Sequence, residues 1–202
     1  GKAATVSGTF SLTCATAPDY VWIKGAGPES IEFPATKVSV GTTSPHTMTY
    51  PATAGSKVFE NAIVRFFKPF TINWQISFDN GKNWKSAGAS SNTLYVTQST
   101  PQTASGNFKW YHTVFDISCR NADKKSAETD IISSVWSEFT DHIVLNYNND
   151  SLFYYKAMNS PNVTLGTLLK YRDAECYTFA QLFLALIKIQ GIVRTNNYVY
   201  IE

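Results

Sequence analysis

The pattern of apolar and polar positions changes its period between the two halves of the chain. Up to about residue 100, apolar and polar residues alternate in short runs, as in strands that bury one face of a sheet. Gly and Pro clusters separate these runs and predict turns. This pattern predicts a small antiparallel β-sandwich. The predicted strands span residues 31–33, 37–40, 63–67, 71–76 and 94–97, with turns at 25–28, 44–45 and 54–55.

One turn, within residues 77–84, has a more specific signature. Its Asn80-Gly81 pair tolerates positive φ and therefore predicts a tight hairpin. Asp79 is expected to cap the turn and Trp84 to cover it. The segment resembles the Asp-box hairpin that recurs in sialidase-type propellers. Because the chain holds one copy, we interpret it as a structural turn.

Beyond residue 100 the spacing becomes helical, after one further predicted strand at 108–117. From Ser126 to Asp141 the apolar residues recur every three or four positions, which predicts a helix with Ser126 as its N-cap. Residues 99–106 and 144–162 are rich in polar residues and predict loops. Residues 197–202 read as the start of another strand. A chain that stops there suggests a longer natural protein or a missing partner segment.

Two more helices are predicted after residue 162. Thr164 is expected to cap a short helix, and Asp173 to cap a longer one that spans about 174–190. Gly191 is a natural end for the longer helix. The whole pattern predicts an α+β protein, with a sandwich domain at 1–100 and a domain of one strand plus helices at 101–202.

Composition and charge narrow the class of protein. Charged residues make up 16% of the 202 residues, below the roughly 25% of typical soluble domains. The net charge of +2 gives no reason to expect nucleic-acid binding. No apolar stretch reaches the roughly 20 residues of a membrane-spanning helix. The high aromatic content favours an extracytoplasmic protein, whether secreted, periplasmic or on the cell surface.

The three cysteines and three histidines show no metal-ligand spacing, so we predict no metal and no cofactor. Cys14 and Cys119 lie in strand-like contexts. They either form a disulfide, which leaves Cys176 free, or stay buried and reduced.

Cys176 is the central candidate for chemistry. With Asp173 as N-cap, Cys176 falls in the first turn of the last helix, where unpaired N–H groups and the helix dipole favour a thiolate. The same N–H groups could hold a developing oxyanion. The rest of the helix is apolar all round, which predicts a buried, rigid mount for a nucleophile. The alternative is that Cys176 is a small buried side chain.

The residues of this helix resemble the nucleophile helix of transglutaminase-like (papain-related) thiol proteins. Ala174 stands where that family prefers Gly, and the similarity covers about residues 164–201. A looser similarity to uncharacterised bacterial proteins extends further back. The matching residues are Cys176, Phe179-Ala180, Leu182-Phe183 and Gly191-Ile192.

This resemblance implies acyl transfer or amide hydrolysis by a Cys-His-Asp triad. The family takes its His and Asp from strands after the helix, but the residues that follow Cys176 include neither. Only Cys176 is therefore carried over. His112 and Asp116, on one face of the predicted strand, are weak candidates for a base and its orienting acid in a rearranged site.

Two functions remain open at this point. The first is a thiol acyltransferase or peptidase-like enzyme with Cys176 as nucleophile, which predicts an accessible Cys176 beside a groove. The second is an extracellular module without catalysis that binds protein or carbohydrate through the sandwich. It predicts a buried Cys176 and exposed aromatic residues such as Trp22, Trp84 or Trp110. The oligomeric state cannot be predicted.

Overall fold

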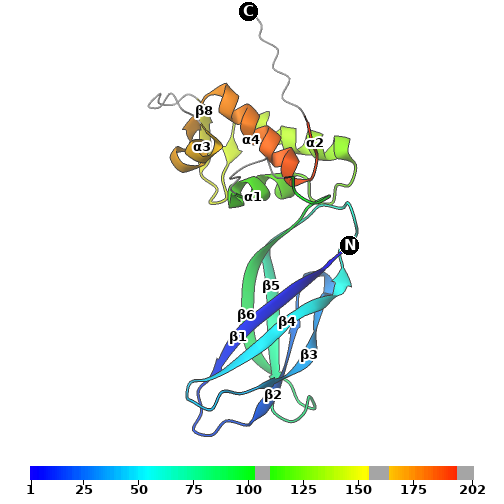
Figure 1. Ribbon diagram of the computed structural model, residues 1–202, viewed down its shortest axis with the longest axis vertical. Coiled ribbons are helices and arrows are strands. Elements are labelled where there is room, and N and C mark those ends of the chain that lie inside the picture. The colour runs from blue at the N-terminus through cyan, green and yellow to red at the C-terminus, as the bar shows by residue number, and fades with distance from the viewer. Residues whose placement is uncertain (103–109, 155–163, 195–202) are drawn as a thin grey trace, which may run out of the picture. The chain divides into compact units, whose positions relative to one another are not determined.

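The computed structural model describes residues 1–102, 110–154 and 164–194, and it confirms an α+β protein (Figure 1). The chain divides into two compact units. The first consists of Gly1–Glu60 and Phe67–Leu94, and the second of Asn61–Phe66 and Tyr95–Glu202. The division thus falls after Leu94, and one short segment of the β-rich half belongs to the second unit.

The first unit consists of two sheets. One has the strand order β1-β4 and the other β3-β2-β5-β6. Pairing is antiparallel between β1 and β4, between β2 and β3, and between β2 and β5. The strands are β1 (Ala3–Leu12), β2 (Tyr20–Ala26), β3 (Glu32–Ser39), β4 (His46–Val58), β5 (Arg65–Ser77) and β6 (Lys85–Val96), with a 3₁₀ turn at Pro28–Ser30.

Aromatic residues from both sheets meet inside the first unit. The indole of Trp74 on β5 lies 5.3 Å from the ring of Phe10 on β1 and 5.3 Å from that of Tyr50 on β4. The Tyr50 hydroxyl donates to the carbonyl of Pro34 at 2.8 Å. The buried phenol thus keeps a hydrogen-bond partner while its ring fills the core.

The strands are longer than the sequence pattern indicated. The turn predicted at 54–55 is absent, because β4 continues through Gly55. A Cβ atom at Gly55 would lie 2.7 Å from Cγ2 of Ile31. Glycine therefore marks a close approach of two strands here, not a break.

The hairpin between β5 and β6 forms at the predicted place. Asn80 and Gly81 have φ angles of 60° and 81°. The carboxylate of Asp79 accepts hydrogen bonds from the Asn83 backbone at 2.8 Å and the Ser77 hydroxyl at 2.7 Å. These bonds lower the pKa of Asp79 to about 2. The carboxylate cap therefore stays ionised at a lower pH than an ordinary Asp would.

The second unit contains the helices and a small mixed sheet of order β7-β8-β9. Pairing is antiparallel between β7 and β8 and parallel between β8 and β9. The elements are α1 (His112–Asn121), α2 (Glu128–Trp136), a 3₁₀ turn (Ser137–Phe139), β7 (Val144–Leu145), β8 (Ser151–Tyr154), α3 (Leu165–Tyr171), β9 (Asp173–Ala174) and α4 (Cys176–Ile189).

The strand predicted at 108–117 is wrong where the structure describes it, because the chain is helical from His112 onward; residues 108–109 lie outside the described part of the chain. The helix found there packs against α4 through a residue that looks like a surface position in the sequence. Ser118 is buried and donates its hydroxyl hydrogen to the carbonyl of Leu186 at 2.7 Å. Gln190 donates in turn to the Ser118 hydroxyl at 2.8 Å. A small polar residue thus brings α1 close to α4, a contact that local alternation cannot reveal.

The predicted helix caps had mixed outcomes. Thr164 caps α3 through a capping box with Thr167, as expected. Ser126 and Asp173 are not caps, because α2 and α4 begin after Ala127 and Glu175. The predicted helix at 126–141 ends at Trp136 and continues as the 3₁₀ turn.

The predicted loops contain more structure than expected. Strands β7 and β8 lie within the loop predicted at 144–162, whose residues 155–162 are outside the described part of the chain. Of the loop predicted at 99–106, residues 103–106 lie outside the described part of the chain. The amides of Ser99 and Gln102 donate to carbonyls of Gln190 and Lys188 at the end of α4. The strand expected at 197–202 also lies outside the described residues.

Candidate functional site

Cys176 occupies the first helical position of α4 and is exposed. Strand β9 ends two residues earlier and pairs with β8, which fixes the direction from which the chain enters the helix. Glu175 is the N-cap with extended backbone, and its carbonyl accepts hydrogen bonds from the amides of Thr178 and Phe179. Cys176 therefore lies in the first turn, as predicted, but the N-cap is Glu175, two residues later than the expected Asp173.

Helix α4 is buried along one face and less so along another. The fully covered side chains include Leu182, Leu186 and Ile189. The sequence predicted a helix buried all round, but a second apolar stripe is only partly covered. That stripe repeats every three or four positions, so it follows one face of the helix. It consists of Cys176, Phe179, Ala180, Phe183 and Leu184, and all five line one groove.

The groove has a volume of about 790 Å³, within the range of roughly 300–1,000 Å³ that holds small-molecule ligands. Its other wall runs from the end of α2 through β7 and β8. No Asp, Glu, Lys or Arg is among its described lining residues. Beyond the stripe of α4, these residues are Trp136, Phe139, His142, Ile143, Val144, Ser151, Leu152, Phe153 and Tyr154.

Aromatic side chains form both ends of the groove. The ring of Phe183 meets Trp136 edge-on at 5.2 Å and Phe139 at 5.8 Å. Near Cys176, the ring of Tyr154 lies 6.1 Å from Phe179. Trp136 and Tyr154 nevertheless remain 55% and 59% exposed. Large aromatic surfaces left open beside a groove are typical of a binding site.

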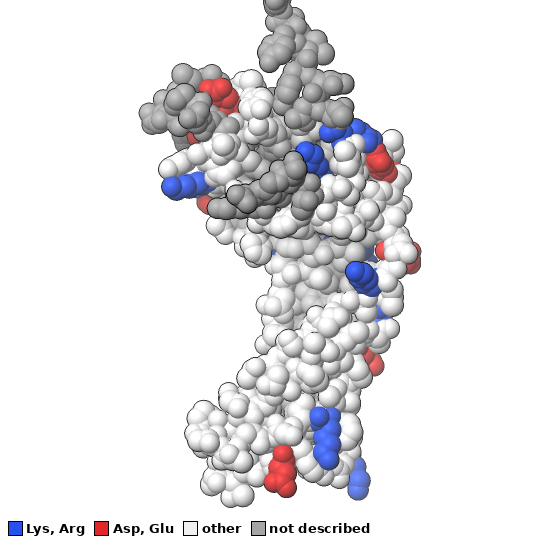
Figure 2. Space-filling model, viewed as in Figure 1, with Lys and Arg blue, Asp and Glu red and all other residues white. Residues whose placement is uncertain are grey.

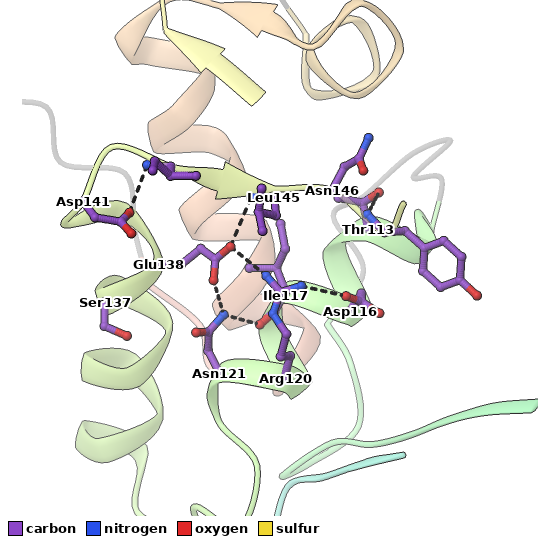
Figure 3. A network of polar contacts seen from close by, with 12 residues as sticks. Thr113, Asp116, Ile117, Arg120, Asn121, Ser137, Glu138, Asp141, Leu145 and Asn146 are labelled. Atoms are coloured by element: carbon purple, nitrogen blue, oxygen red, sulfur yellow. Dashed lines mark hydrogen bonds and ion pairs between the residues drawn. The ribbon is translucent and has the colours of Figure 1, made fainter. Parts of the chain in front are cut away.

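A polar network holds the wall that faces α4 (Figure 3). The Glu138 carboxylate accepts hydrogen bonds from Arg120 at 2.7 Å, from Asn121 at 2.7 Å and from the Leu145 amide at 3.2 Å. It thereby joins α1, the 3₁₀ turn and β7. Because the side chain of Glu138 is only 10% exposed, its charge requires these partners.

His142 lies in the turn that this network holds, and it lines the same groove as Cys176. Its φ angle is 62°, a left-handed conformation that is uncommon for residues other than Gly. The Asp141 carboxylate accepts the Ile143 amide at 2.9 Å and closes the turn. Among the described residues, Cys176 and His142 are the only Cys and His that share this groove. Sequence reasoning missed His142, because its position relative to α4 depends on tertiary packing.

The structure does not bring His112 and Asp116 to Cys176. Neither residue lines the groove. Both lie on α1, one turn apart, where His112 is exposed and its ring lies 5.6 Å from that of Tyr147. Asp116 is buried and pairs with Arg120 at 3.0 Å. Asp116 thus serves the ion-pair network instead of orienting a base.

All three cysteines are free thiols, so the disulfide between Cys14 and Cys119 is absent. Cys119 is fully buried beside Gln190, whose side-chain amide donates to its sulfur at 3.4 Å. Burial raises the pKa of the Cys119 thiol to about 12. Cys119 is therefore a core residue, in contrast to Cys176.

The aromatic residues proposed for ligand binding by the sandwich are less exposed than expected. Trp22 and Trp84 are half-buried, and the Lys24 ammonium lies 4.3 Å from the ring centre of Trp84. Trp110 is exposed but belongs to the second unit. On the face in Figure 2, charges of both signs are scattered over both units.

Within residues 1–102, 110–154 and 164–194, no three or more His, Cys, Asp or Glu side chains form a group that could hold a metal ion. None of the helices in these segments has the length and apolar character required to cross a membrane. No family model, curated protein or solved structure matches the chain. The similarity to transglutaminase-like proteins thus stays a prediction from the sequence.

Proposed function

We propose that this protein catalyses thiol-dependent acyl transfer or amide hydrolysis, with Cys176 as the nucleophile. The observation that carries the proposal is the position of Cys176. It is an exposed thiol at the first position of α4 and heads the apolar stripe that lines the groove. A buried, inert cysteine would have favoured the binding module.

The chemistry requires three steps. The sulfur of Cys176 attacks the acyl carbonyl carbon, and the backbone N–H groups of the first turn stabilise the oxyanion that forms. The bond to the leaving oxygen or nitrogen then breaks, and the leaving group takes the proton of the thiol. Water or an acceptor finally cleaves the thioester and regenerates the thiol.

We assign the proton transfers to His142, because it shares the groove with Cys176. This base precedes the nucleophile in the chain, whereas the similar family places it afterwards. The site would thus combine the family's nucleophile helix with a different source of the base. His112, the weak candidate from the sequence, has no such position.

The binding alternative, recognition of protein or carbohydrate by the sandwich, has less support. Trp22 and Trp84 are half-buried, and the largest exposed aromatic surfaces around a groove lie in the second unit. An extracytoplasmic location is compatible with either function and remains part of the proposal.

Acyl-enzyme formation tests the proposed enzyme directly. The protein is incubated with p-nitrophenyl acetate and its intact mass is followed, beside Cys176→Ala and Cys119→Ala as a matched pair. We expect an acetyl adduct in the wild type and in Cys119→Ala, and none in Cys176→Ala. Neutral hydroxylamine should remove the adduct as a hydroxamate, as expected for an acetyl group bonded to sulfur. Equal amounts of acetyl adduct in all three proteins would show that Cys176 is not the nucleophile.

A further inference from the structure

The groove beside Cys176 has a chemical character that indicates a substrate class. Its described lining is mostly aromatic and aliphatic, with polar side-chain atoms at Trp136, His142, Ser151, Tyr154 and Cys176 and with no Asp, Glu, Lys or Arg. A carbohydrate would need many hydrogen-bond partners there, and a charged side chain would need a counter-charge. An uncharged apolar group needs neither.

The orientation of the stripe on α4 places this apolar surface in line with the thiol. Phe179, Ala180 and Phe183 follow Cys176 on the same helix face. An acyl group bonded to the sulfur can therefore lie along α4, with its chain against these side chains. The opposite wall offers Trp136 and Tyr154, both more than half exposed and thus available for contact.

We propose that the groove selects an uncharged, apolar acyl group, which Cys176 receives as a thioester. The inference rests on the proposed function and adds the substrate class to it. In the transfer, the carbon–sulfur bond forms first, and the bond between the carbonyl carbon and the leaving oxygen or nitrogen then breaks. The thiol proton leaves with the alcohol or amine, and no oxidation or reduction is involved.

The test compares p-nitrophenyl acetate, butyrate and hexanoate with p-nitrophenyl hemisuccinate, which matches butyrate in length but ends in a carboxylate. The rate of Cys176 acylation is measured by nitrophenolate release and intact mass. We expect the rate of Cys176 acylation to rise about two- to threefold per added methylene. This increase is smaller than full burial of a methylene would give, because the groove is open to solvent. The hemisuccinate should react about tenfold or more slowly than butyrate.

Each outcome separates the inference from the proposed function. If Cys176 reacts with all esters at equal rates, or fastest with the hemisuccinate, the proposed apolar specificity is wrong. The role of Cys176 as the nucleophile would still stand. The absence of any Cys176-dependent adduct would overturn both.

A matched set of variants locates the specificity in the groove. Ala180 is exposed and lines the groove, so a longer side chain fits there without disturbing the core. Ala180→Glu should lower the ratio of hexanoate to acetate rates about tenfold, whereas the neutral Ala180→Gln should change it much less. Gln181→Glu adds the same charge to α4 outside the groove and should leave the ratio unchanged. An equal effect of both Glu variants would contradict a groove-based specificity.

Discussion

Cys176 and Cys119 lie in the same unit but in opposite environments. Cys176 is exposed at the start of α4, whereas Cys119 is fully buried on α1 between Ser118 and the Gln190 amide. The sequence alone left both thiols as possible buried residues, because the exposure of a side chain depends on which helices pack together. Their contrast gives a direct test of the site.

Alkylation by iodoacetamide should distinguish the two thiols. At pH 8 we expect Cys176 to be labelled in the native protein and Cys119 to be protected. Cys119 is inaccessible, and its pKa of about 12 leaves almost no thiolate at that pH. Peptide mass spectrometry reports each site, and denaturant should release Cys119. Rapid native labelling of Cys119 would contradict the packing of α1 against α4.

Substitution of His142 tests the assigned base. Asn tolerates the left-handed conformation at φ 62°, so His142→Asn should fold normally. We expect its acylation rate to fall about 10²-fold or more, as for loss of a general base, and its pH profile to lose the inflection of a histidine. His112→Asn, an exposed change outside the groove, is the control. Equal rates in both variants would exclude His142 as the base.

At the scale of single elements, α4 carries the site and its two ends are fixed differently. Its start follows β9, and its end is a Schellman motif, in which the amides of Ile192 and Gly191 donate to the carbonyls of Ile187 and Lys188. Gly191 has a φ angle of 81°. The sequence predicted this end correctly, because the signal is local: one glycine after an apolar run.

Gly191→Ala should therefore weaken the helix that presents Cys176. An added Cβ would meet Cβ of Ser99 at 2.7 Å and the carbonyl oxygen of Thr100 at 3.0 Å, in a conformation unfavourable for Ala. We expect a loss of about 1–2 kcal/mol in the free energy of unfolding, measured by urea titration. Gly88, which also has positive φ but open space around it, is the control for conformation alone. A larger loss in Gly88→Ala than in Gly191→Ala would contradict this account.

At the scale of the whole molecule, the boundary between the two units does not follow the sequence order. Val64 comes from the β-rich half of the chain, yet it is buried in the core of the second unit. Its amide donates to the carbonyl of Lys125, and its carbonyl accepts from the amide of Lys124, both in the segment that follows α1. The division predicted at residue 100 did not assign the segment around Val64 to the second unit, because a single buried valine has no distinctive sequence pattern.

Hydrogen exchange can show which unit each core residue stabilises. Val64→Ala should destabilise the second unit by about 2 kcal/mol and raise amide exchange in α1 and α4. Val21→Ala makes the same change in the sandwich core and should raise exchange in β2 and β3 instead. Equal increases in both units for either variant would mean that the two units unfold as one.

Features whose signals lie within a few residues could be predicted from the sequence. These are the alternating strands of the first unit, the Asn80-Gly81 hairpin, the Thr164 cap, and the place of Cys176 in the first turn of an apolar helix. Each follows from backbone preferences or from the period of apolar side chains.

Only the tertiary structure decided which apolar faces are covered. Residues 112–117, predicted as part of a strand, are helical, and their helix α1 packs on α4, where the buried Ser118 donates to the Leu186 carbonyl and accepts from Gln190. One face of α4 stays partly open and becomes one wall of the groove, and the turn at His142 contributes to the lining of the same groove. Burial and proximity between distant segments depend on the summed packing of all elements, which no local pattern encodes.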